Sequence, residues 1–253
     1  MSNTKPERNR DHYSYALYEK DEVTHGFDKA RFSGAVGEFF KSHQESIIRE
    51  HAGDPSGKTI LDVGAGTGRT ALPLAHAGAH VVAADASVKM LNIIREKSFL
   101  QGAPVQLSRI DAHDLPFADQ SFDVVMSFRM IMHVTQWDKA VAELCRVSRG
   151  SVIVDFPPVS GFAGLAPLVH PIIRPFNPNH QSYKVFKIRE VTDALKDNGF
   201  EVSAIDKHVV LPFGLHRAVN SIGFTKWSER VLAKTGFRWL FGAPVTIVAN
   251  RTR

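Results

Sequence analysis

The chain has little cysteine and no long apolar run, and each absence excludes a class of protein. Its 253 residues contain one cysteine, Cys145, which excludes an intramolecular disulfide framework and an all-cysteine zinc site. No apolar run reaches the about 20 residues that a membrane-spanning helix needs, because prolines interrupt the longest candidate at 161–173. The first ten residues are polar and charged, without the apolar segment of a secretory signal. These features predict a reduced, soluble, cytoplasmic protein.

Acidic residues are scarce in the C-terminal part of the chain. The net charge is +5, and residues 156–253 hold 13 Lys and Arg against 6 Asp and Glu. A basic region with interleaved aromatic residues could attract nucleic acid, an anionic lipid surface or an acidic substrate. The charges are scattered rather than clustered, so an ordinary solvated face is the alternative.

Short apolar runs alternate with helical segments in the centre of the chain. Repeated strand–helix–strand units predict a parallel sheet with right-handed crossovers. The expected fold is therefore α/β: a doubly wound, Rossmann-like sheet with helices on both faces, whose ligands bind beyond the carboxyl ends of the strands. Strands are expected at 59–63, 80–84, 105–110, 122–127 and 151–155, and helices at 69–77, 87–98 and 137–147.

The flanking regions are less regular. Residues 1–27 are expected to be a flexible N-terminal segment, and Asp28 is placed to cap a helix that runs to residue 51. Irregular insertions at about 156–187 and 211–243 are expected to form a cap. Between and after them, a helix is expected at 189–198, strands at 201–210 and 245–250, and one or two short helices over 215–240.

A glycine-rich turn joins the first predicted strand to the next helix. Gly64, Gly66 and Gly68 follow Asp62 at a spacing of two residues, and glycine is needed where a ligand lies against the backbone or φ is positive. A dinucleotide-binding loop would place its third glycine at position 69, where Arg69 stands, and no Gly-Lys-Ser/Thr follows as in a Walker loop. The turn therefore argues against NAD and against a nucleoside triphosphate.

Acidic residues also end the next two strands. A carboxylate at Asp85 can accept hydrogen bonds from both hydroxyls of a ribose, although capping of the following helix is the alternative role. Asp111 can accept a hydrogen bond from the exocyclic amine of adenine, and Ala112 leaves room for the ring. Asp123, at the start of the fourth strand, is expected to bind backbone donors there instead of a ligand.

These residues resemble motifs of the class I S-adenosylmethionine-dependent methyltransferases. Residues 62–68 fill every position of Asp/Glu-x-Gly-x-Gly-x-Gly, and residues 111–123 are similar to the Asp-Ala-x-x-Leu-Pro-Phe-x-Asp-x-Ser-Phe-Asp run of the ubiquinone/menaquinone-biosynthesis type. The resemblance covers roughly 59–155. It implies a seven-stranded, mostly parallel sheet, a single methyltransferase domain over 28–253 with its core at 59–155, and S-adenosylmethionine as cofactor, with S-adenosylhomocysteine as product. The cofactor-binding residues that it implies are Asp62, Gly64, Ala65, Gly66, Gly68, Asp85, Ala86, Asp111, Ala112 and Phe128.

His133 is the candidate catalytic residue. It follows the fourth strand at the cofactor rim, where the resembling family often has a histidine, and an imidazole pKa of about 6.5 suits proton removal from a phenol or enol. A histidine that only shapes the loop is the alternative. Arg129 could hold a substrate anion, and Tyr18 could contact the acceptor from a segment over the cofactor. No histidine pair has metal-ligand spacing on a helix face, so no metal is expected.

The resemblance implies methyl transfer to a small organic acceptor, and the aromatic C-terminal third favours a hydroxylated aromatic, quinol-like or lipophilic molecule. Amino-methylating nucleic-acid enzymes carry Asn/Asp-Pro-Pro-Tyr/Phe after the fourth strand, whereas this chain has no proline there. Nucleic acid is therefore not expected as a partner. An RNA or protein methyltransferase that uses the basic third, and a non-catalytic S-adenosylmethionine-binding protein, are the alternatives. Contact with a membrane surface, and a monomer or homodimer, are left open.

Overall fold

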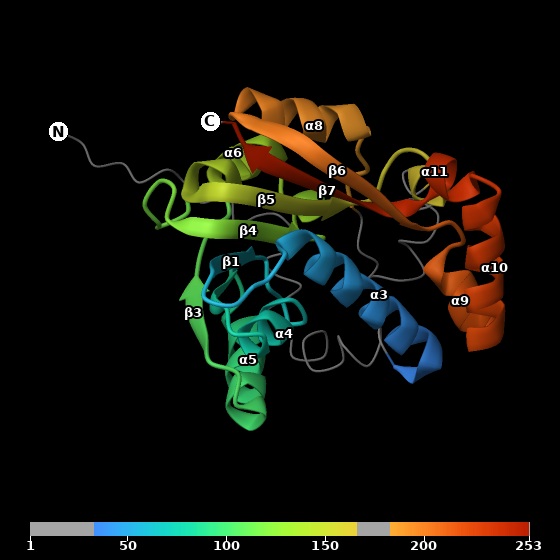
Figure 1. The fold of residues 1–253 in the computed structure, drawn as a ribbon, viewed down its shortest axis with the longest axis horizontal. Coiled ribbons are helices and arrows are strands. Elements are labelled where there is room, and N and C mark those ends of the chain that lie inside the picture. Colours follow the sequence, from blue (N-terminus) through green and yellow to red (C-terminus); the bar gives the residue numbers. More distant parts are fainter. Residues whose placement is uncertain (1–32, 166–182, 253) are drawn as a thin grey trace.

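The computed structural model describes residues 33–165 and 183–252, and its centre is a seven-stranded sheet (Figure 1). The strand order is β3-β2-β1-β4-β5-β7-β6, and β7 runs antiparallel to both of its neighbours while the other pairs are parallel. The predicted seven-stranded, mostly parallel sheet is confirmed. The strands are β1 (Thr59–Val63), β2 (His80–Asp85), β3 (Val105–Arg109), β4 (Phe122–Phe128), β5 (Ser148–Phe156), β6 (Phe200–Val209) and β7 (Ala243–Arg251).

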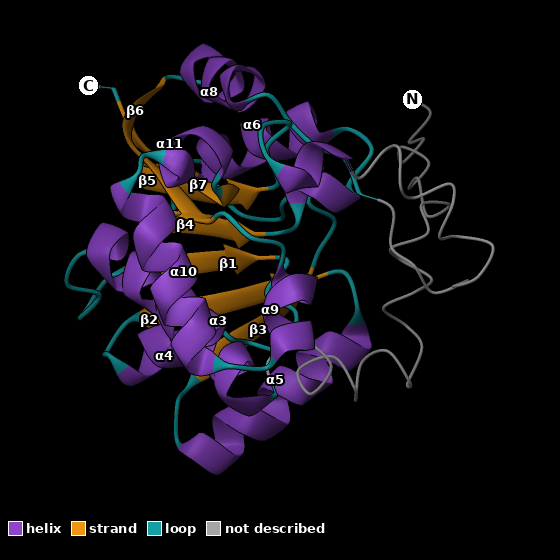
Figure 2. Ribbon diagram, turned by 90° about the vertical axis from the view of Figure 1, so that its right-hand side faces the viewer, coloured by secondary structure: helices purple, strands orange, loops and turns teal. Residues whose placement is uncertain are grey.

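Helices cover both faces of this sheet, as Figure 2 shows. The helices α3 (Gly34–Ala52), α4 (Ala71–His76) and α5 (Val88–Gln101) share an apolar core with one face. The helices α6 (Trp137–Val147) and α8 (Ile188–Asp197) pack on the other. Side chains alternate along each strand, so Ile60 enters the first core and Leu61 the second.

The strand order reverses beside β1, which pairs with β2 on one side and β4 on the other. In a doubly wound sheet, the connections from two such strands diverge to opposite faces and leave a crevice at the carboxyl ends. The glycine loop follows β1 directly and therefore lies at this switch point. The fold places it where ligands bind in open α/β sheets.

Three short helices lie between β6 and β7: α9 (Phe213–Val219), α10 (Ile222–Lys234) and α11 (Phe237–Phe241). Because β5 and β6 are both antiparallel to β7, they are parallel to each other. Their carboxyl ends therefore share the sheet edge that carries the glycine loop. The 3-10 turns η1 (Ile131–His133) and η2 (Phe162–Leu165) follow β4 and β5 at this same edge.

Two predictions on the helices are wrong in detail. The helix expected to begin at Asp28 begins at Gly34, with Ser33 before it; Asp28 and the segment 1–27 lie outside the described residues. The region 215–240 contains three helices instead of one or two, because Asn220 and Gly236 adopt left-handed φ angles of 48° and 81°, which interrupt helices. In the described ranges, every helix is too short or too polar to cross a bilayer.

Candidate functional site

The glycine loop is tied to the end of β2. The N–H groups of Gly64 and Ala65 donate to the Ala84 carbonyl oxygen at 2.8 and 3.1 Å. Gly64, Gly66 and Gly68 all have positive φ, at 76°, 55° and 81°. A side chain strains the backbone in this region, so the conformation confirms the expectation that these positions require glycine.

The three glycines differ in what a side chain would meet. A Cβ at Gly64 would lie 2.7 Å from the Met130 side chain, and one at Gly68 would lie 3.2 Å from Ile94. A Cβ at Gly66 would have no described atom within 4 Å. Close packing within the protein therefore explains two of the glycines, whereas Gly66 faces open space and is the one placed to lie against a ligand.

Asp62 is a buried carboxylate beneath this loop. It is 1% exposed, and its Oδ2 atom has no hydrogen-bond donor among the described residues. Burial and the nearby charge of Asp85 raise the pKa of Asp62 to about 7, while the Arg69 guanidinium opposes that rise. A buried acceptor atom without a donor among the described residues is placed to accept a hydrogen bond from a group beyond them, such as a ligand.

Asp85 connects the end of β2 to the glycine loop. Its Oδ2 accepts a hydrogen bond from the Gly66 N–H and its Oδ1 accepts one from the Ser87 N–H, both at 2.9 Å. The cap of α5 is Ser87, whose hydroxyl accepts from the Met90 N–H at 3.3 Å. The alternative role of Asp85 as the helix cap is therefore wrong. A carboxylate has about four lone-pair sites and can therefore accept several hydrogen bonds at once. Ala86 lies half-buried beside it.

The turn after β3 lies next to Asp85. The Ile110 N–H donates to the Asp85 carbonyl oxygen at 3.1 Å. In this turn, Asp111 Oδ1 accepts from the His113 backbone N–H at 3.0 Å and lies 2.7 Å from His113 Nδ1. Ala112 is buried. The structure thus brings the predicted residues Asp85, Asp111 and Ala112 to one stretch of the edge.

The remainder of the second motif is structural. The Arg146 guanidinium donates to the carbonyl oxygens of Leu115 and Phe117 at 2.9 and 2.8 Å and so fixes the apolar turn. Asp123 accepts hydrogen bonds from the N–H and the hydroxyl of Thr59, both at 2.8 Å. These bonds lie at the amino ends of β1 and β4 and confirm the expectation that Asp123 binds backbone donors.

The chain after β4 forms the other side of the edge. Phe128 is buried, and Arg129 adopts a left-handed φ of 57°. The loop then places Met130 against Gly64 and leads into η1, where His133 is 8% exposed. His133 therefore lies on a loop that packs directly on the glycine loop. Tyr18 lies outside the described residues.

Asp155 was not selected from the sequence, although the structure makes it a second buried carboxylate at this edge. Its Oδ1 accepts a hydrogen bond from the Arg129 N–H at 2.7 Å, and its Oδ2 is without a donor in the parts described. Burial raises the pKa of Asp155, while Arg129 and Arg69 oppose the rise. The sequence signal was available, because Asp155 closes an apolar strand just as Asp62 and Asp85 do.

Two other buried side chains, Cys145 and His216, have surroundings typical of a structural role. Cys145 is buried in α6, and burial raises the pKa of its thiol to about 12, which keeps it protonated. His216 is buried in α9, with Nδ1 3.1 Å from the Thr225 hydroxyl and Nε2 3.0 Å from Glu229 Oε1. The described part of the chain contains no group of three or more His, Cys, Asp or Glu side chains arranged to hold a metal ion.

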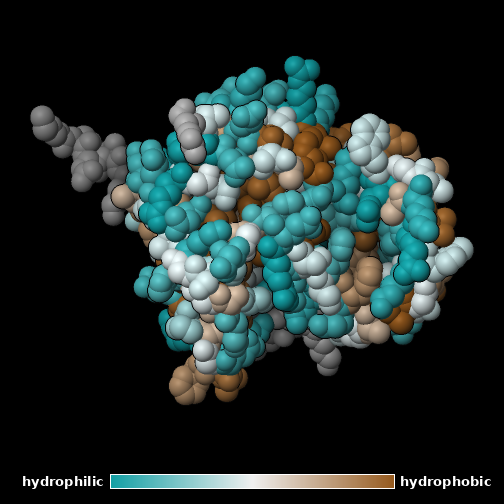
Figure 3. Space-filling model, viewed as in Figure 1, coloured by the Kyte–Doolittle hydropathy of each residue, from teal (hydrophilic) through white to brown (hydrophobic). Residues whose placement is uncertain are grey.

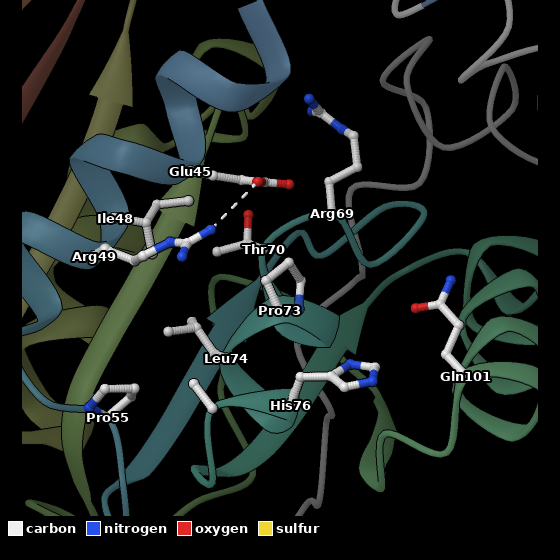
Figure 4. Close-up of a pocket in the computed structure, with 11 residues that line it drawn as sticks. Glu45, Ile48, Arg49, Pro55, Arg69, Thr70, Pro73, Leu74, His76 and Gln101 are labelled. Atoms are coloured by element: carbon white, nitrogen blue, oxygen red, sulfur yellow. Dashed lines mark ion pairs between the residues drawn. The ribbon is translucent and has the colours of Figure 1, made fainter. Parts of the chain in front are cut away.

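A separate groove of about 370 Å³ lies between α3 and α4 (Figure 4). An ion pair between Glu45 and Arg49, at 3.7 Å, lies along its α3 side. Arg69 borders it too, but none of the residues predicted to bind cofactor or acceptor lines it. The groove is therefore distinct from the candidate site. Its lining residues are Glu45, Ile48, Arg49, Pro55, Arg69, Thr70, Pro73, Leu74, His76, Ala77 and Gln101.

Comparison with known proteins identifies the central region. Residues 61–154 match a family described as a methyltransferase domain. A demethylmenaquinone methyltransferase of Clavibacter sepedonicus is 38% identical over 146 residues, which cover 55% of this chain and 58% of that protein. An uncharacterized protein of Mycobacterium tuberculosis is 35% identical over 135 residues, covering 53% of this chain and 48% of that protein. The chain thus spans about half the length of the curated relatives that it matches.

A solved structure extends the likeness to the whole fold. The magnesium protoporphyrin IX methyltransferase of Synechocystis PCC 6803, crystallised with S-adenosylmethionine, superposes with a TM-score of 0.65 at 17% identity, covering 98% of this chain and 100% of that one. Residues 61–154 therefore resemble a methyltransferase domain, and they lie in a fold like that of this solved structure. The resemblance inferred from the motifs, including its menaquinone-type character, is confirmed.

Proposed function

We propose that the protein is an S-adenosylmethionine-dependent methyltransferase that acts on a small, lipophilic, hydroxylated acceptor. One arrangement carries the proposal. Within the described ranges, the backbone at Gly66 has open space beside it and Oδ2 of buried Asp62 has no donor, and both lie with the Asp85 carboxylate at one sheet edge. The matched methyltransferase domain contains all three residues.

The residues at this edge suit the groups of S-adenosylmethionine. Asp62 would attract the ammonium group of its amino-acid part, and a bound cation there would favour the ionised carboxylate. Asp85 would accept hydrogen bonds from the ribose hydroxyls, and Asp111 would accept one from the adenine amine beside Ala112. Bound in this way, the cofactor supplies an electrophilic methyl group on a sulfonium. The remaining proposed contacts are Gly64, Ala65, Gly68, Ala86 and Phe128.

A quinol-like or other hydroxylated aromatic acceptor is supported by two observations. The second motif is similar to that of quinone-biosynthesis methyltransferases, and a relative 38% identical in part is named a demethylmenaquinone methyltransferase. The insertions at about 156–187 and 211–243 leave the sheet at the edge of the site and are rich in apolar side chains. Lipophilic acceptors bind in such apolar surroundings with a few polar contacts.

His133 is the proposed base. The hydroxyl proton of the acceptor would pass to the His133 imidazole, which would leave the acceptor oxygen nucleophilic toward the methyl group that the cofactor would supply. Arg129 would stabilise the negative charge that develops on the acceptor oxygen, and Asp155 would hold Arg129 through its backbone N–H. Tyr18 remains a proposed acceptor contact.

The proposal extends to the setting of the enzyme. We infer a cytoplasmic protein, monomer or homodimer, whose residues 28–253 form one methyltransferase domain with core 59–155. Its partner is a small molecule and not a nucleic acid.

Incubation with methyl-labelled S-adenosylmethionine tests the proposal. The acceptor panel contains quinols, phenols, fatty acids, RNA and protein, and the expected result is label in a quinol or phenol. Label in RNA or protein alone would establish the alternative methyltransferase. Binding of cofactor with no label in any acceptor would instead indicate a non-catalytic protein.

His133→Ala tests the base. Turnover is expected to fall by about 10²–10⁴-fold, the usual contribution of a positioned base, with little change in cofactor affinity. His80→Ala is the matched control, because His80 is exposed at the opposite end of β2. Equal turnover in the two variants would return His133 to a role in shaping the loop.

A further inference from the structure

The helices α10 and α11 lie at one end of the molecule (Figure 1) and carry several exposed aromatic side chains. Trp239 is 76% exposed and Trp227 is 64% exposed. None of the five residues of α11 is buried, although four of them are apolar or aromatic. Isolated exposed apolar residues are normal, whereas a group of this kind marks an interaction site. The cap surface, as we call it, consists of Trp227, Val231, Phe237, Trp239, Leu240 and Phe241.

The charges around the cap surface have one sign. Lys226, Arg230 and Lys234 follow one another at four-residue intervals on α10, and all three are exposed. Arg238 adds a further exposed cation from α11. The one acidic residue of 211–242, Glu229, is 7% exposed and faces inward. Figure 3 shows apolar and hydrophilic side chains interspersed at this end of the molecule.

The cap surface is held in place by contacts beneath it. The Lys207 ammonium, from β6, donates to the Trp239 carbonyl oxygen at 2.5 Å. Gly161 approaches Phe241 so closely that a Cβ there would lie 2.3 Å from the Phe241 carbonyl oxygen. The insertions after β5 and β6 therefore meet at α11. The fold holds these aromatic side chains outward, and they are not the end of a loose tail.

The cap surface also lies at the functional edge of the sheet. The segment that bears it leaves β6 at the carboxyl end, and η2 leaves β5 at its carboxyl end. The glycine loop and His133 belong to this same edge. A partner bound to the cap surface would therefore lie on the side of the molecule from which an acceptor enters.

We propose that the cap surface docks on an anionic lipid bilayer. Tryptophan and phenylalanine side chains would enter the boundary between headgroups and acyl chains, where amphipathic aromatic rings are favoured. The cations of α10 and α11 would lie on anionic headgroups, with an attraction that falls off within a Debye length. That the lipophilic acceptor comes from the same bilayer rests on the proposed function, whereas docking itself does not.

The composition of the cap surface favours lipid over two other occupants. A second copy of the chain, paired through the same surface by a two-fold axis, would bring like charges together. RNA bases stack on aromatic rings, but exposed aliphatic side chains such as Val231 and Leu240 offer no stacking platform. An acyl-chain boundary accommodates both kinds of side chain.

Vesicle binding tests the docking. The full chain is sedimented with vesicles of phosphatidylcholine alone and of phosphatidylcholine and phosphatidylglycerol in equal parts. Lys226→Gln with Arg230→Gln removes two exposed cations beside the cap surface, on α10. Arg189→Gln with Lys196→Gln removes two exposed cations from α8 as the matched control. Trp239→Ser removes the most exposed aromatic ring.

We expect salt-sensitive binding to the anionic vesicles only. The cap double variant should bind about 25-fold more weakly, since each cation near an anionic surface contributes about fivefold, and the α8 double variant should lose less. Trp239→Ser should weaken binding at least about tenfold. Three results would overturn the proposal: no binding, equal losses in the two double variants, or binding of poly-uridine RNA in place of vesicles. Titration of the wild-type protein with S-adenosylhomocysteine keeps the two proposals separate. A protein that binds vesicles but not S-adenosylhomocysteine would contradict the proposed function and not the docking.

Discussion

Asp62 has a carboxylate whose burial conflicts with its charge. The ordinary pKa of an aspartate is about 3.8, and burial raises the pKa of Asp62 to about 7. Between these two pH values the folded protein holds a proton that the unfolded chain has lost. The free energy of unfolding contributed by this group therefore falls as pH rises from about 4 to about 7. The ionised Asp62 carboxylate therefore destabilises the folded protein, and it lies where the ammonium group of the proposed cofactor would bind.

Asp62→Asn should remove the loss of stability that ionisation of the buried carboxylate causes. The variant should be more stable than the wild type at about pH 8, by on the order of 2–4 kcal/mol, and the difference should shrink toward zero near pH 4. Thermal unfolding across this pH range, followed by circular dichroism, measures it. Parallel curves for the two proteins would show that Asp62 titrates normally. The same substitution should weaken binding of S-adenosylhomocysteine.

Alanine substitutions at Gly64 and Gly66 distinguish an effect on packing from an effect on cofactor binding. Gly64→Ala should unfold more easily, by roughly 2–4 kcal/mol, because its Cβ would collide with Met130 at a positive φ. Gly66→Ala should lose only about 1 kcal/mol from its φ, since its Cβ meets open space, yet it should bind the cofactor much more weakly. Urea unfolding and calorimetry on both variants distinguish the effects. A Gly66→Ala protein with full affinity would mean that no ligand lies against this residue.

At the scale of elements, the buried strands were predictable from the sequence. A parallel strand covered on both faces is a short apolar run, and 59–63 was predicted with the bounds that the structure has. The number of helices in 215–240 was not predictable, because the left-handed turns at Asn220 and Gly236 leave little trace in hydrophobic periodicity. The residues of the candidate site that belong to sequence motifs, such as Asp62 and Asp111, were predicted from the sequence. Asp155 lies at the end of an apolar strand as Asp62 and Asp85 do, but no motif marks it, and its role depends on a hydrogen bond to Arg129 beside the neighbouring strand β4.

Glu229 anchors α10 to the end of β6. Its carboxylate accepts from the N–H groups of Val210 and Leu211 at 2.8 and 3.0 Å and also binds His216. Glu229→Gln replaces one acceptor oxygen by a donor and should lower the free energy of unfolding by about 1–3 kcal/mol. Urea unfolding measures the loss, with Glu201→Gln, exposed on β6, as the control. Equal stabilities of the two variants would mean that α10 is held by apolar contacts alone.

At the scale of the whole molecule, one edge of the sheet gathers the functional features. The carboxylates of Asp62, Asp85 and Asp155 lie at the carboxyl ends of parallel strands, and the glycine loop, the loop with His133 and both insertions follow such ends. The opposite edge carries structural contacts, such as that between Asp123 and Thr59. This division follows from the winding of the sheet, which opens a crevice at the switch point only on the carboxyl side.

Calorimetric titration with S-adenosylhomocysteine tests the central claim most directly. The wild type should bind it with a dissociation constant on the order of micromolar and should give no heat with NADH. Asp85→Asn should bind roughly 5- to 150-fold more weakly, because the ribose hydroxyls lose an acceptor. Asp193→Asn, exposed on α8, should bind like the wild type. A wild-type protein that fails to bind S-adenosylhomocysteine, or that binds NADH equally well, would contradict the assignment of this edge as a methyltransferase site.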